Sequence, residues 1–487
     1  LNAYDYNDDN AEMSAAAADL RLSNHSYGII CGWDSFGLSW YGDPNISNDE
    51  DYKFGFYTEN ESKAWDQIAY NAPYYLIVKS AGNDRGHGPL LGSSHPADAE
   101  PDSGYDTIGP QGVAKDILTV GAVNDIPNGY SQPSDVVMSS FSSWGPTDDG
   151  RIKPDIVANG VGLYSSTAGS DNAYSTYDGT SMSSPNATGS LTLLQEHYAN
   201  LHNGDWMLAS TLKALVIHTA DEAGDADGPD FRFGWGLLNT EKAANLITEA
   251  NNSALTSTIR VDTLQENQTI SYQIHTDGTS PLKITICWTD APGKPVAPQL
   301  DPPDLMLIND LDMRLVGTDS TYMPWVLDPI NRTVPATTGD NFRDNVEQIY
   351  VAAPPAGDYT IQISHKDTLY NNQQVFSIVI NDAQFNGSPN TLEKASEAAP
   401  NKFRLYGNYP NPFNPSTNIR FDLATAGRTT LTVYDALGKK ITTLVDKYLP
   451  AGQYTFKWNA GQLSSGIYFY RLQTGKLSQV KRMLLVK

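Results

Sequence analysis

Residues 179–185 carry side chains suited to nucleophilic attack on a carbonyl group. They read Gly-Thr-Ser-Met-Ser-Ser-Pro and lead into an amphipathic segment, so Ser181 falls where a loop enters a helix. Unpaired backbone N–H groups and the positive end of a helix dipole meet at such a junction, which suits a nucleophile whose attack creates an oxyanion. An ordinary N-cap serine, the commoner use of Ser before a helix, is the alternative interpretation.

Asn83 is the second residue suited to this chemistry. It follows the apolar run 74–80 in the sequence Ser-Ala-Gly-Asn-Asp. At the end of a strand its amide could point into a cleft and donate a hydrogen bond to a developing negative charge. A turn is the alternative, since Asn is also common where a strand ends.

The elements around these residues alternate between helix and strand. Apolar strands that alternate with helices predict a parallel sheet covered by helices. We therefore expect an α/β domain over residues 1–250, with Pro185 in the first turn of the helix that follows Ser181. The predicted helices cover 11–23, 61–72, 184–200 and 210–220, and the predicted strands cover 74–80 and 117–123.

The pattern changes from about Thr256 to short β-type stretches with no long helix between them. This pattern predicts an all-β sandwich or jelly roll over residues 255–385. Residues 386–401 are small, polar and contain Pro, which is typical of a linker. Further β-type stretches separated by Gly predict a second, smaller sandwich over residues 402–487.

Charge divides the 487 residues at the same place. The whole chain carries −24, but residues 402–487 hold 13 Lys and Arg against three Asp, or +10, which leaves −34 for the rest. Such a change of sign indicates a domain boundary. The acidic balance argues against nucleic acid as a partner, and no apolar run approaches the ~18–20 residues that span a bilayer. The two cysteines, Cys31 and Cys287, are expected to be separate buried thiols.

Together the stretches around Ser181 and Asn83 resemble the subtilisin-like serine proteases, or subtilases, over roughly residues 11–247. The segments Asn24–Gly28, FSSWGPTDDGRIKPDIVANG (141–160) and FGWGLLN (233–239) match this family as well. The resemblance implies a subtilisin-like α/β catalytic domain that hydrolyses peptide bonds. It implies that Ser181 is the acylating nucleophile and that Asn83 and the backbone N–H of Ser181 bind the oxyanion.

The same resemblance implies how a protein or peptide substrate is bound. One segment, the edge, would pair with the extended backbone of the substrate as an added strand. Another segment, the wall, would form one side of the pocket for the primary side chain of the substrate. These segments are Ser26, Tyr27 and Gly28 for the edge, and Ser80, Ala81 and Gly82 for the wall.

Two members of the subtilase triad are not found in the sequence. In this family the order along the chain is Asp, His, Ser, and both earlier elements precede the region matched by Asn24–Gly28, where this chain has 23 residues. His87 stands in Gly-His-Gly but is followed by Pro89, so we interpret it as a loop residue. We expect a longer protease with its Asp and His upstream, and an inactive chain in isolation. An inactive binding or adhesion protein on the same scaffold is the alternative.

Residues 255–385 resemble the jelly-roll domain that follows the catalytic domain in some large bacterial subtilases. The matching stretches are NDLD (309–312), DNVE (344–347) and APPAGDYTIQIS (353–364). Carboxylates two residues apart on a strand face the same side, and such oxygens suit a structural Ca²⁺. The candidate ligands are Asp310, Asp312, Asp344 and Glu347, although acids at strand ends are also commonly just solvated. No cofactor is expected for the chemistry.

Residues 402–487 resemble the type A C-terminal sorting domain of the type IX secretion system of Bacteroidetes-type bacteria. The matching stretches are YPNPFNPST (409–417), VYDALGKK (433–440), LPAGQYTFKWN (449–459) and SSGIYFYRLQTG (464–475). The resemblance implies export through the periplasm, recognition of this tail by the type IX secretion machinery, and release or attachment at the outer-membrane surface. We expect the protein to be a monomer.

Overall fold

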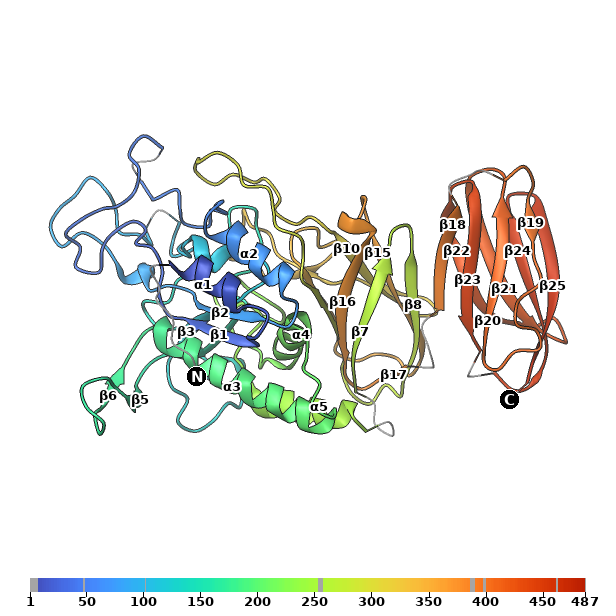
Figure 1. The fold of residues 1–487 in the computed structure, drawn as a ribbon, viewed down its shortest axis with the longest axis horizontal. Coiled ribbons are helices and arrows are strands. Elements are labelled where there is room, and N and C mark those ends of the chain that lie inside the picture. The colour runs from blue at the N-terminus through green and yellow to red at the C-terminus, as the bar shows by residue number, and fades with distance from the viewer. Residues whose placement is uncertain are drawn as a thin grey trace.

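A computed structural model describes residues 8–46, 49–100, 102–252, 257–385, 390–396, 400–460 and 463–486. An N-terminal part with helices and strands, a middle β part and a C-terminal β part follow one another along the longest axis of the molecule (Figure 1). None of the helices in these ranges is long and apolar enough to cross a membrane.

A four-stranded parallel sheet lies at the centre of the N-terminal part. Its order is β1 (Leu22–His25), β2 (Leu76–Ser80), β3 (Leu118–Val123) and β4 (Ile156–Asn159), and each neighbouring pair runs parallel. Alternate side chains around β2 enter two different hydrophobic clusters: Leu76 and Val78 enter one, and Tyr75 and Ile77 enter the other. The sheet is therefore covered on both faces, as the alternating pattern predicted.

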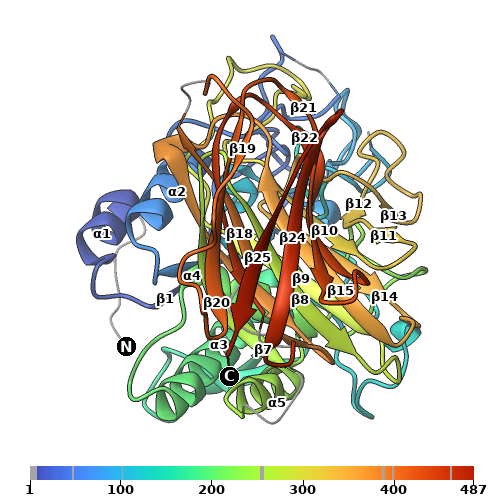
Figure 2. The same ribbon diagram turned by 90° about the vertical axis from the view of Figure 1, so that its right-hand side faces the viewer.

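Helices from both ends of this part supply the two covering layers. One layer contains α1 (Asp9–Ala16) and α2 (Ser62–Asn71), whose Met13 and Trp65 are buried against Tyr75 and Ile77. The other contains α3 (Thr180–Leu201), α4 (Ala209–Thr219) and α5 (Thr240–Ala250). Helices α1 and α2 lie together on one flank, while α3 and α5 lie side by side at another (Figure 2).

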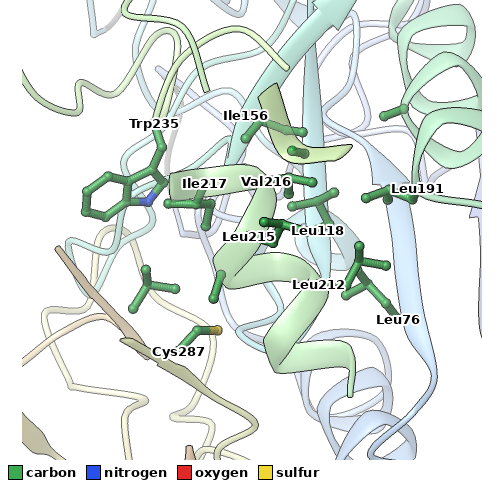
Figure 3. Close-up of a cluster of buried hydrophobic side chains, with 14 of the residues drawn as sticks. Leu76, Leu118, Ile156, Leu191, Leu212, Leu215, Val216, Ile217, Trp235 and Cys287 are labelled. Atoms are coloured by element: carbon green, nitrogen blue, oxygen red, sulfur yellow. The ribbon is translucent and has the colours of Figure 1, made fainter. Parts of the chain in front are cut away.

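Helix α4 is buried at every residue because it packs between two sheets. Its Leu212, Leu215 and Val216 lie beside Leu118 of the parallel sheet, while Cys287 of the middle part approaches from the opposite side (Figure 3). The middle part therefore shares a hydrophobic core with the N-terminal part.

Some predicted boundaries need correction. The helix predicted at 184–200 begins at Thr180, so Pro185 lies inside it rather than in its first turn. The helix predicted at 11–23 ends at Ala16. Strands β1 and β4 have only four residues each, which is too short for a distinct apolar pattern. Cys31 and Cys287 are free and buried, as predicted.

The middle part consists of two antiparallel sheets around one core that includes Trp288 and Phe376. The first sheet has the order β14 (Val346–Val351), β9 (Leu282–Trp288), β16 (Gln373–Ile380) and β7 (Thr258–Gln265). The second has the order β11 (Thr321–Tyr322), β10 (Leu311–Val316), β15 (Gly357–His365) and β8 (Thr269–Thr276), with β17 (Gln384–Phe385) also paired to β8.

The C-terminal part has its own core, which includes Phe421, Trp458 and Tyr470. One of its sheets has the order β22 (Lys440–Leu449), β21 (Gly427–Asp435), β24 (Gly466–Thr474) and β25 (Leu477–Leu485). The other contains β18 (Asn390–Ser396), β23 (Gly452–Asn459), β20 (Ser416–Leu423) and β19 (Arg404–Leu405).

The N-terminal and middle parts also contain short elements. Two of these are the strand pairs β5 (Leu163–Ser166) with β6 (Tyr174–Tyr177) and β12 (Trp325–Val326) with β13 (Thr337–Thr338). The others are the 3₁₀ turns η2 (Asp84–Gly86), η3 (Pro110–Val113), η4 (Pro133–Asp135) and η5 (Tyr370–Asn372).

Strand β18 falls within the segment 386–401, which the sequence predicted as a linker. It pairs with β8 of the middle part and with β23 of the C-terminal part. The linker prediction is wrong for this stretch, because the polar composition of residues 390–396 does not prevent backbone pairing on both sides.

Buried charges connect the N-terminal part to the loop between β9 and β10. The ammonium of Lys115 lies 2.6 Å from Asp290 Oδ2 and donates to the carbonyls of Ala291 and Met306 at 2.6 and 2.9 Å. The side chains of Lys115 and Asp290 are inaccessible to solvent. Both oxygens of Asp290 accept further bonds from the backbone N–H groups of Ile308 and Asn309.

Replacing Lys115 by Ala should lower the free energy of unfolding by about 3–5 kcal/mol, because the variant leaves the Asp290 carboxylate buried without its cation. Denaturant unfolding of the wild type and the variant measures this loss. The control is Lys63→Ala, which removes an exposed pair with Glu59 and should cost about 0.5 kcal/mol or less. Equal losses in the two variants would contradict the role given to Lys115.

Candidate active site

A single cleft of about 420 Å³ brings together all eight residues predicted for catalysis and substrate binding. It opens where β1 and β2 end and where α3 begins, at the carboxyl edge of the parallel sheet. Ligands bind at this edge in open α/β sheets. The eight residues are Ser26, Tyr27, Gly28, Ser80, Ala81, Gly82, Asn83 and Ser181.

Ser181 is the second residue of α3 and is tied to the segment after β1 by two hydrogen bonds. Its hydroxyl donates to the Ser26 carbonyl at 3.2 Å, and the Ser26 hydroxyl donates to the Ser181 carbonyl at 3.0 Å. The Ser181 carbonyl is available because Pro185, four residues later, has no N–H to complete the helical bond. Pro185 inside the helix therefore helps to attach the helix start to the edge segment.

Asn83 is held in one orientation by Thr180. The backbone N–H and the hydroxyl of Thr180 both donate to Asn83 Oδ1 at 2.9 Å. A backbone N–H can only donate, so the amide oxygen must face it and the amide nitrogen must face away. The orientation of the Asn83 amide is thus fixed before any substrate is bound.

The two nitrogen donors of the site converge on the space beside Gly179. A β-carbon on Gly179 would lie 3.6 Å from Asn83 Nδ2 and 3.6 Å from the backbone nitrogen of Ser181. Gly179 has φ +145°, a conformation that favours glycine. A residue with a side chain would place its β-carbon within 3.6 Å of both donors.

The edge and wall segments are also bound to one another. The Ser80 hydroxyl donates to the His25 carbonyl at 3.3 Å, which joins the ends of β1 and β2. The backbone N–H of Gly82 donates to the Thr180 hydroxyl at 3.2 Å, which joins the wall segment to the start of α3. The three segments therefore form one connected frame around the cleft.

His25 supports the edge segment from within the protein. Its Nε2 lies 2.6 Å from the Ser23 hydroxyl and its Nδ1 lies 2.6 Å from the Tyr27 hydroxyl. The Tyr27 hydroxyl also donates to Asp9 of α1 at 3.2 Å. Burial, assisted by the charge of Lys79, lowers the pKa of His25 to about 4. His25 is therefore neutral at physiological pH.

Within the described ranges, no histidine hydrogen-bonds to Ser181. His87 lies in the loop after η2, as interpreted from the sequence, and it lines the same cleft. Its Nδ1 lies 3.8 Å from Asp84 Oδ1, and Asp98 joins these two residues in one group of potential ligands. No pattern in the sequence relates Asp98 to His87.

The predicted Ca²⁺ site at Asp310, Asp312, Asp344 and Glu347 needs correction. Asp310 and Asp312 do face the same side, but Lys366 lies between them, 2.8 Å from Asp310 Oδ2 and 3.3 Å from Asp312 Oδ1. Arg314 also pairs with Asp312 at 3.0 Å. The charge that a cation would balance is already balanced by basic side chains.

The other two predicted ligands serve the backbone. Asp344 accepts from the backbone N–H of Ile152 in the N-terminal part at 2.8 Å, and Glu347 accepts from the N–H of Met313 at 2.6 Å. Among the described residues, the four acids are not part of any common group of metal-ligand type. The alternation along a strand predicted the shared side correctly, but it could not predict Lys366 or Arg314.

Lys79 is a residue of the cleft that the sequence reasoning missed. Its side chain lines the cleft, and its ammonium donates to the Ser80 carbonyl at 2.6 Å and lies 3.0 Å from the Ser80 hydroxyl. Burial lowers its pKa to about 8. The available signal was a lysine near the end of the otherwise apolar run 74–80.

The parallel sheet, the serine at the start of α3 and the two converging donors define a domain of serine-hydrolase type. Comparison with known proteins identifies the family of this domain. Residues 2–236 match the subtilase family, and residues 408–487 match the secretion system C-terminal sorting domain. Residues 2–236 thus form a subtilase-family domain, and residues 408–487 form a type IX sorting domain that marks the protein as secreted or displayed at the cell surface.

Several known proteins are similar to parts of this chain. The "Serine protease/ABC transporter B family protein tagA" of Dictyostelium discoideum is 28% identical over 302 residues, which are 55% of this chain and 16% of that protein. The "Serine protease AprX" of Bacillus subtilis is 34% identical over 157 residues, 29% of this chain and 32% of that protein. The chain thus spans less than a third of either relative. The solved structure of the "Patellamide maturation protease PatA" is 20% identical, with a TM-score of 0.32, over 49% of this chain and 67% of its own.

The buried imidazole of His25 should make the protein less stable in acid. The folded-state pKa of about 4 lies below the ordinary value of 6.5, so between these values the unfolded chain binds a proton that the folded chain does not. Its contribution to stability falls as the pH drops from about 6.5 to 4, by roughly 3 kcal/mol at most. Denaturant midpoints at pH 7, 5.5 and 4 should decline less steeply for His25→Gln than for the wild type. Parallel declines would contradict this assignment.

Proposed function

We propose that the protein is a secreted serine endopeptidase that forms its acyl-enzyme on Ser181. The observation that carries this proposal is the convergence of Asn83 Nδ2 and the Ser181 backbone nitrogen on the space beside Gly179. Preorganised donors placed where an oxyanion develops are the largest single contribution to catalysis in many acyl-transfer enzymes. The substrate, by the chemistry of the cleft, is an extended stretch of a protein or peptide.

The reaction follows from the positions of these groups. The substrate backbone lies along Ser26–Gly28 as an added strand, which places a carbonyl carbon near the Ser181 hydroxyl. Attack by Ser181 Oγ forms a C–O bond and moves an electron pair onto the carbonyl oxygen, which then accepts hydrogen bonds from Asn83 and the Ser181 N–H. Collapse breaks the C–N bond and releases the amine with a proton, and water then hydrolyses the ester.

The hydroxyl proton of Ser181 needs a base, since a serine without one is a weak nucleophile. The Ser181 hydroxyl donates instead to the Ser26 carbonyl. We therefore propose that the histidine and its aspartate come from a segment outside these 487 residues. The hydrogen bond from the Ser181 hydroxyl to the Ser26 carbonyl also favours a second candidate function. In that case the protein binds peptides on this scaffold without cleaving them.

The remaining parts have separate roles in this proposal. The two sheets of residues 255–385 would form a jelly-roll accessory domain that is fixed to the catalytic domain through Lys115 and Asp290. Residues 402–487, with their net charge of +10, would be recognised by the type IX secretion machinery, so that the protein is carried through the periplasm. We further propose that the mature protein is a monomer.

The product of the complete reading frame should hydrolyse peptides, and a fluorophosphonate should label Ser181 and stop the reaction. Asn83→Ala should lower kcat by about 10²–10³-fold with KM nearly unchanged, the range known for loss of the corresponding donor in subtilisin. Steady-state kinetics on a chromogenic peptide measures both values. Thr192→Ala, on the exposed side of α3, is the matched control and should retain wild-type kinetics.

Two outcomes would contradict the endopeptidase. If the complete product binds peptides but neither cleaves them nor reacts with the fluorophosphonate, the binding protein is the correct function. If Asn83→Ala raises KM while kcat stays unchanged, Asn83 binds the substrate rather than the oxyanion. The 487-residue chain alone should react with the fluorophosphonate only slowly, and fast labelling of Ser181 would show that a base is already present.

A further inference from the structure

Five carboxylates from distant parts of the sequence gather beside the junction of the N-terminal and middle parts. They form two groups in which the potential ligand atoms all lie within 4.8 Å of one another, and Asp301 belongs to both. Asp301 comes from the loop between β9 and β10, and the other four come from the N-terminal part. The groups are Glu50 with Asp102 and Asp301, and Asp106 with Asp148 and Asp301.

The backbone holds the second group in place. The N–H of Asp148 donates to the Gly55 carbonyl at 3.2 Å, and the N–H of Gly55 donates to the Ile108 carbonyl at 2.9 Å. Gly55 has φ +70°, and a β-carbon there would lie 2.2 Å from Asp148 Oδ1 and 2.3 Å from Asp106 Oδ1. Only glycine leaves room for both oxygens, which therefore face the same small space.

Three of these carboxylate oxygens have no hydrogen-bond partner among the residues that the structure describes. Asp106 is 3% exposed, and its Oδ1 and both oxygens of Asp148 are buried and accept no hydrogen bond. Across the described ranges, Arg332 pairs with Asp102 at 2.8 Å, but no basic side chain pairs with Asp106 or Asp148. Burial of an unpaired carboxylate is costly, and here burial and the neighbouring acids raise the pKa of Asp106 and Asp148 well above the usual range.

We propose that Asp106, Asp148 and Asp301 bind a divalent cation of the Ca²⁺ type, with Glu50 and Asp102 as flanking acids. All the potential ligands are hard carboxylate oxygens on loops, and no nitrogen or sulfur ligand is among them. Ca²⁺ accepts six to eight such oxygens in flexible geometries, whereas Mg²⁺ requires a near-ideal octahedron. Because Asp301 belongs to the middle part, the cation connects this part to the subtilase domain.

The 487-residue chain should therefore be stabilised by Ca²⁺. After treatment with EDTA, addition of 1 mM CaCl₂ should raise the melting temperature by about 5 °C or more, because the ion binds the folded state only. Calorimetric titration with CaCl₂ should detect this site, and MgCl₂ should produce a smaller thermal shift. Asp148→Asn and Asp106→Asn should each lose the shift, and in EDTA Asp148→Asn should melt no lower than the wild type, since one of the crowded charges is gone.

The matched control is Asp310→Asn, which alters an acid whose charge is already balanced by Lys366. This variant should keep the full Ca²⁺ shift. A wild type that does not respond to Ca²⁺ would overturn the proposal. The proposal would also fail if the Ca²⁺-dependent rise in melting temperature survives in both Asp106→Asn and Asp148→Asn. It would fail as well if this rise is lost in Asp310→Asn but retained in Asp148→Asn.

A second, independent observation concerns the charge of Lys79 at the wall of the cleft. Its side chain is 4% exposed, and across the described part of the chain no carboxylate forms an ion pair with it. A β-carbon on Gly28 would lie 3.8 Å from the ammonium nitrogen of Lys79 and 3.7 Å from Gln111 Oε1. The space between the edge and wall segments is therefore bounded by an ammonium and an amide oxygen.

Building on the proposed function, we infer that this pocket selects an acidic substrate side chain, Glu or Asp, at the residue that precedes the cleaved bond. A carboxylate placed there would supply the anion that Lys79 lacks, in a charge-assisted hydrogen bond. A lysine or arginine side chain at the same position would meet a like charge that is already buried. Hydrogen bonds to charged groups are among the stronger ones in proteins.

Binding to the 487-residue chain tests this preference without requiring catalysis. Fluorescent tetrapeptide amides that differ only in a final Glu, Gln or Lys should bind in that order of affinity, with Glu at least about tenfold tighter than Gln. Lys79→Met should remove the preference, and the control Lys63→Met should preserve it. Equal affinities for the three peptides would overturn the role of Lys79 alone, whereas no binding of any peptide would overturn this inference together with the proposed peptide cleft.

Discussion

The attachment of the first turn of α3 to the ends of β1 and β2 is the constraint on which the cleft depends. Helix α3 packs against all four strands of the parallel sheet, and its first residues contact both strand ends through Asn83 and Ser26. Pro185 contributes by releasing the Ser181 carbonyl, and Gly179 contributes by leaving space in front of the two donors. Small changes at any of these positions would move the nucleophile relative to the oxyanion donors.

Contiguous motifs made this site predictable. Ser181 and Asn83 each stand in a short segment with a local reason for its shape, and the helix and strand patterns place both segments at one edge of a parallel sheet. The roles of Thr180 and Lys79 were not predictable, because they depend on which atoms meet across the chain. The same limit explains the error at Asp310 and Asp312, where a strand pattern predicts the facing side of two acids but not the lysine between them.

The strand β18 illustrates a different limit. Its sequence is polar and short, so neither alternation nor composition distinguishes it from a linker. It forms because two edge strands, β8 and β23, each present unpaired backbone groups that a third strand can satisfy. Backbone pairing of this kind carries almost no side-chain signal. The domain boundary that charge predicts at residue 402 therefore lies beside a continuous sheet.

Some buried charges in this protein form ion pairs with other buried side chains, and others do not. We assign a structural role to the paired charges and a binding role to the unpaired charges at the two proposed sites. Lys115 with Asp290, and Asp155 with Lys153 and Lys213, are ion pairs at 2.6 to 2.8 Å. The first pair joins the N-terminal part to the middle part, the second group lies within the N-terminal part, and neither needs a charge from outside. Among the described residues, Asp106 Oδ1 and both oxygens of Asp148 accept no hydrogen bond, and no carboxylate forms an ion pair with the ammonium of Lys79. Since an unpaired buried charge is costly, the proposed cation at Asp106 and Asp148 and the proposed acidic substrate side chain at Lys79 would each supply a charge of the opposite sign.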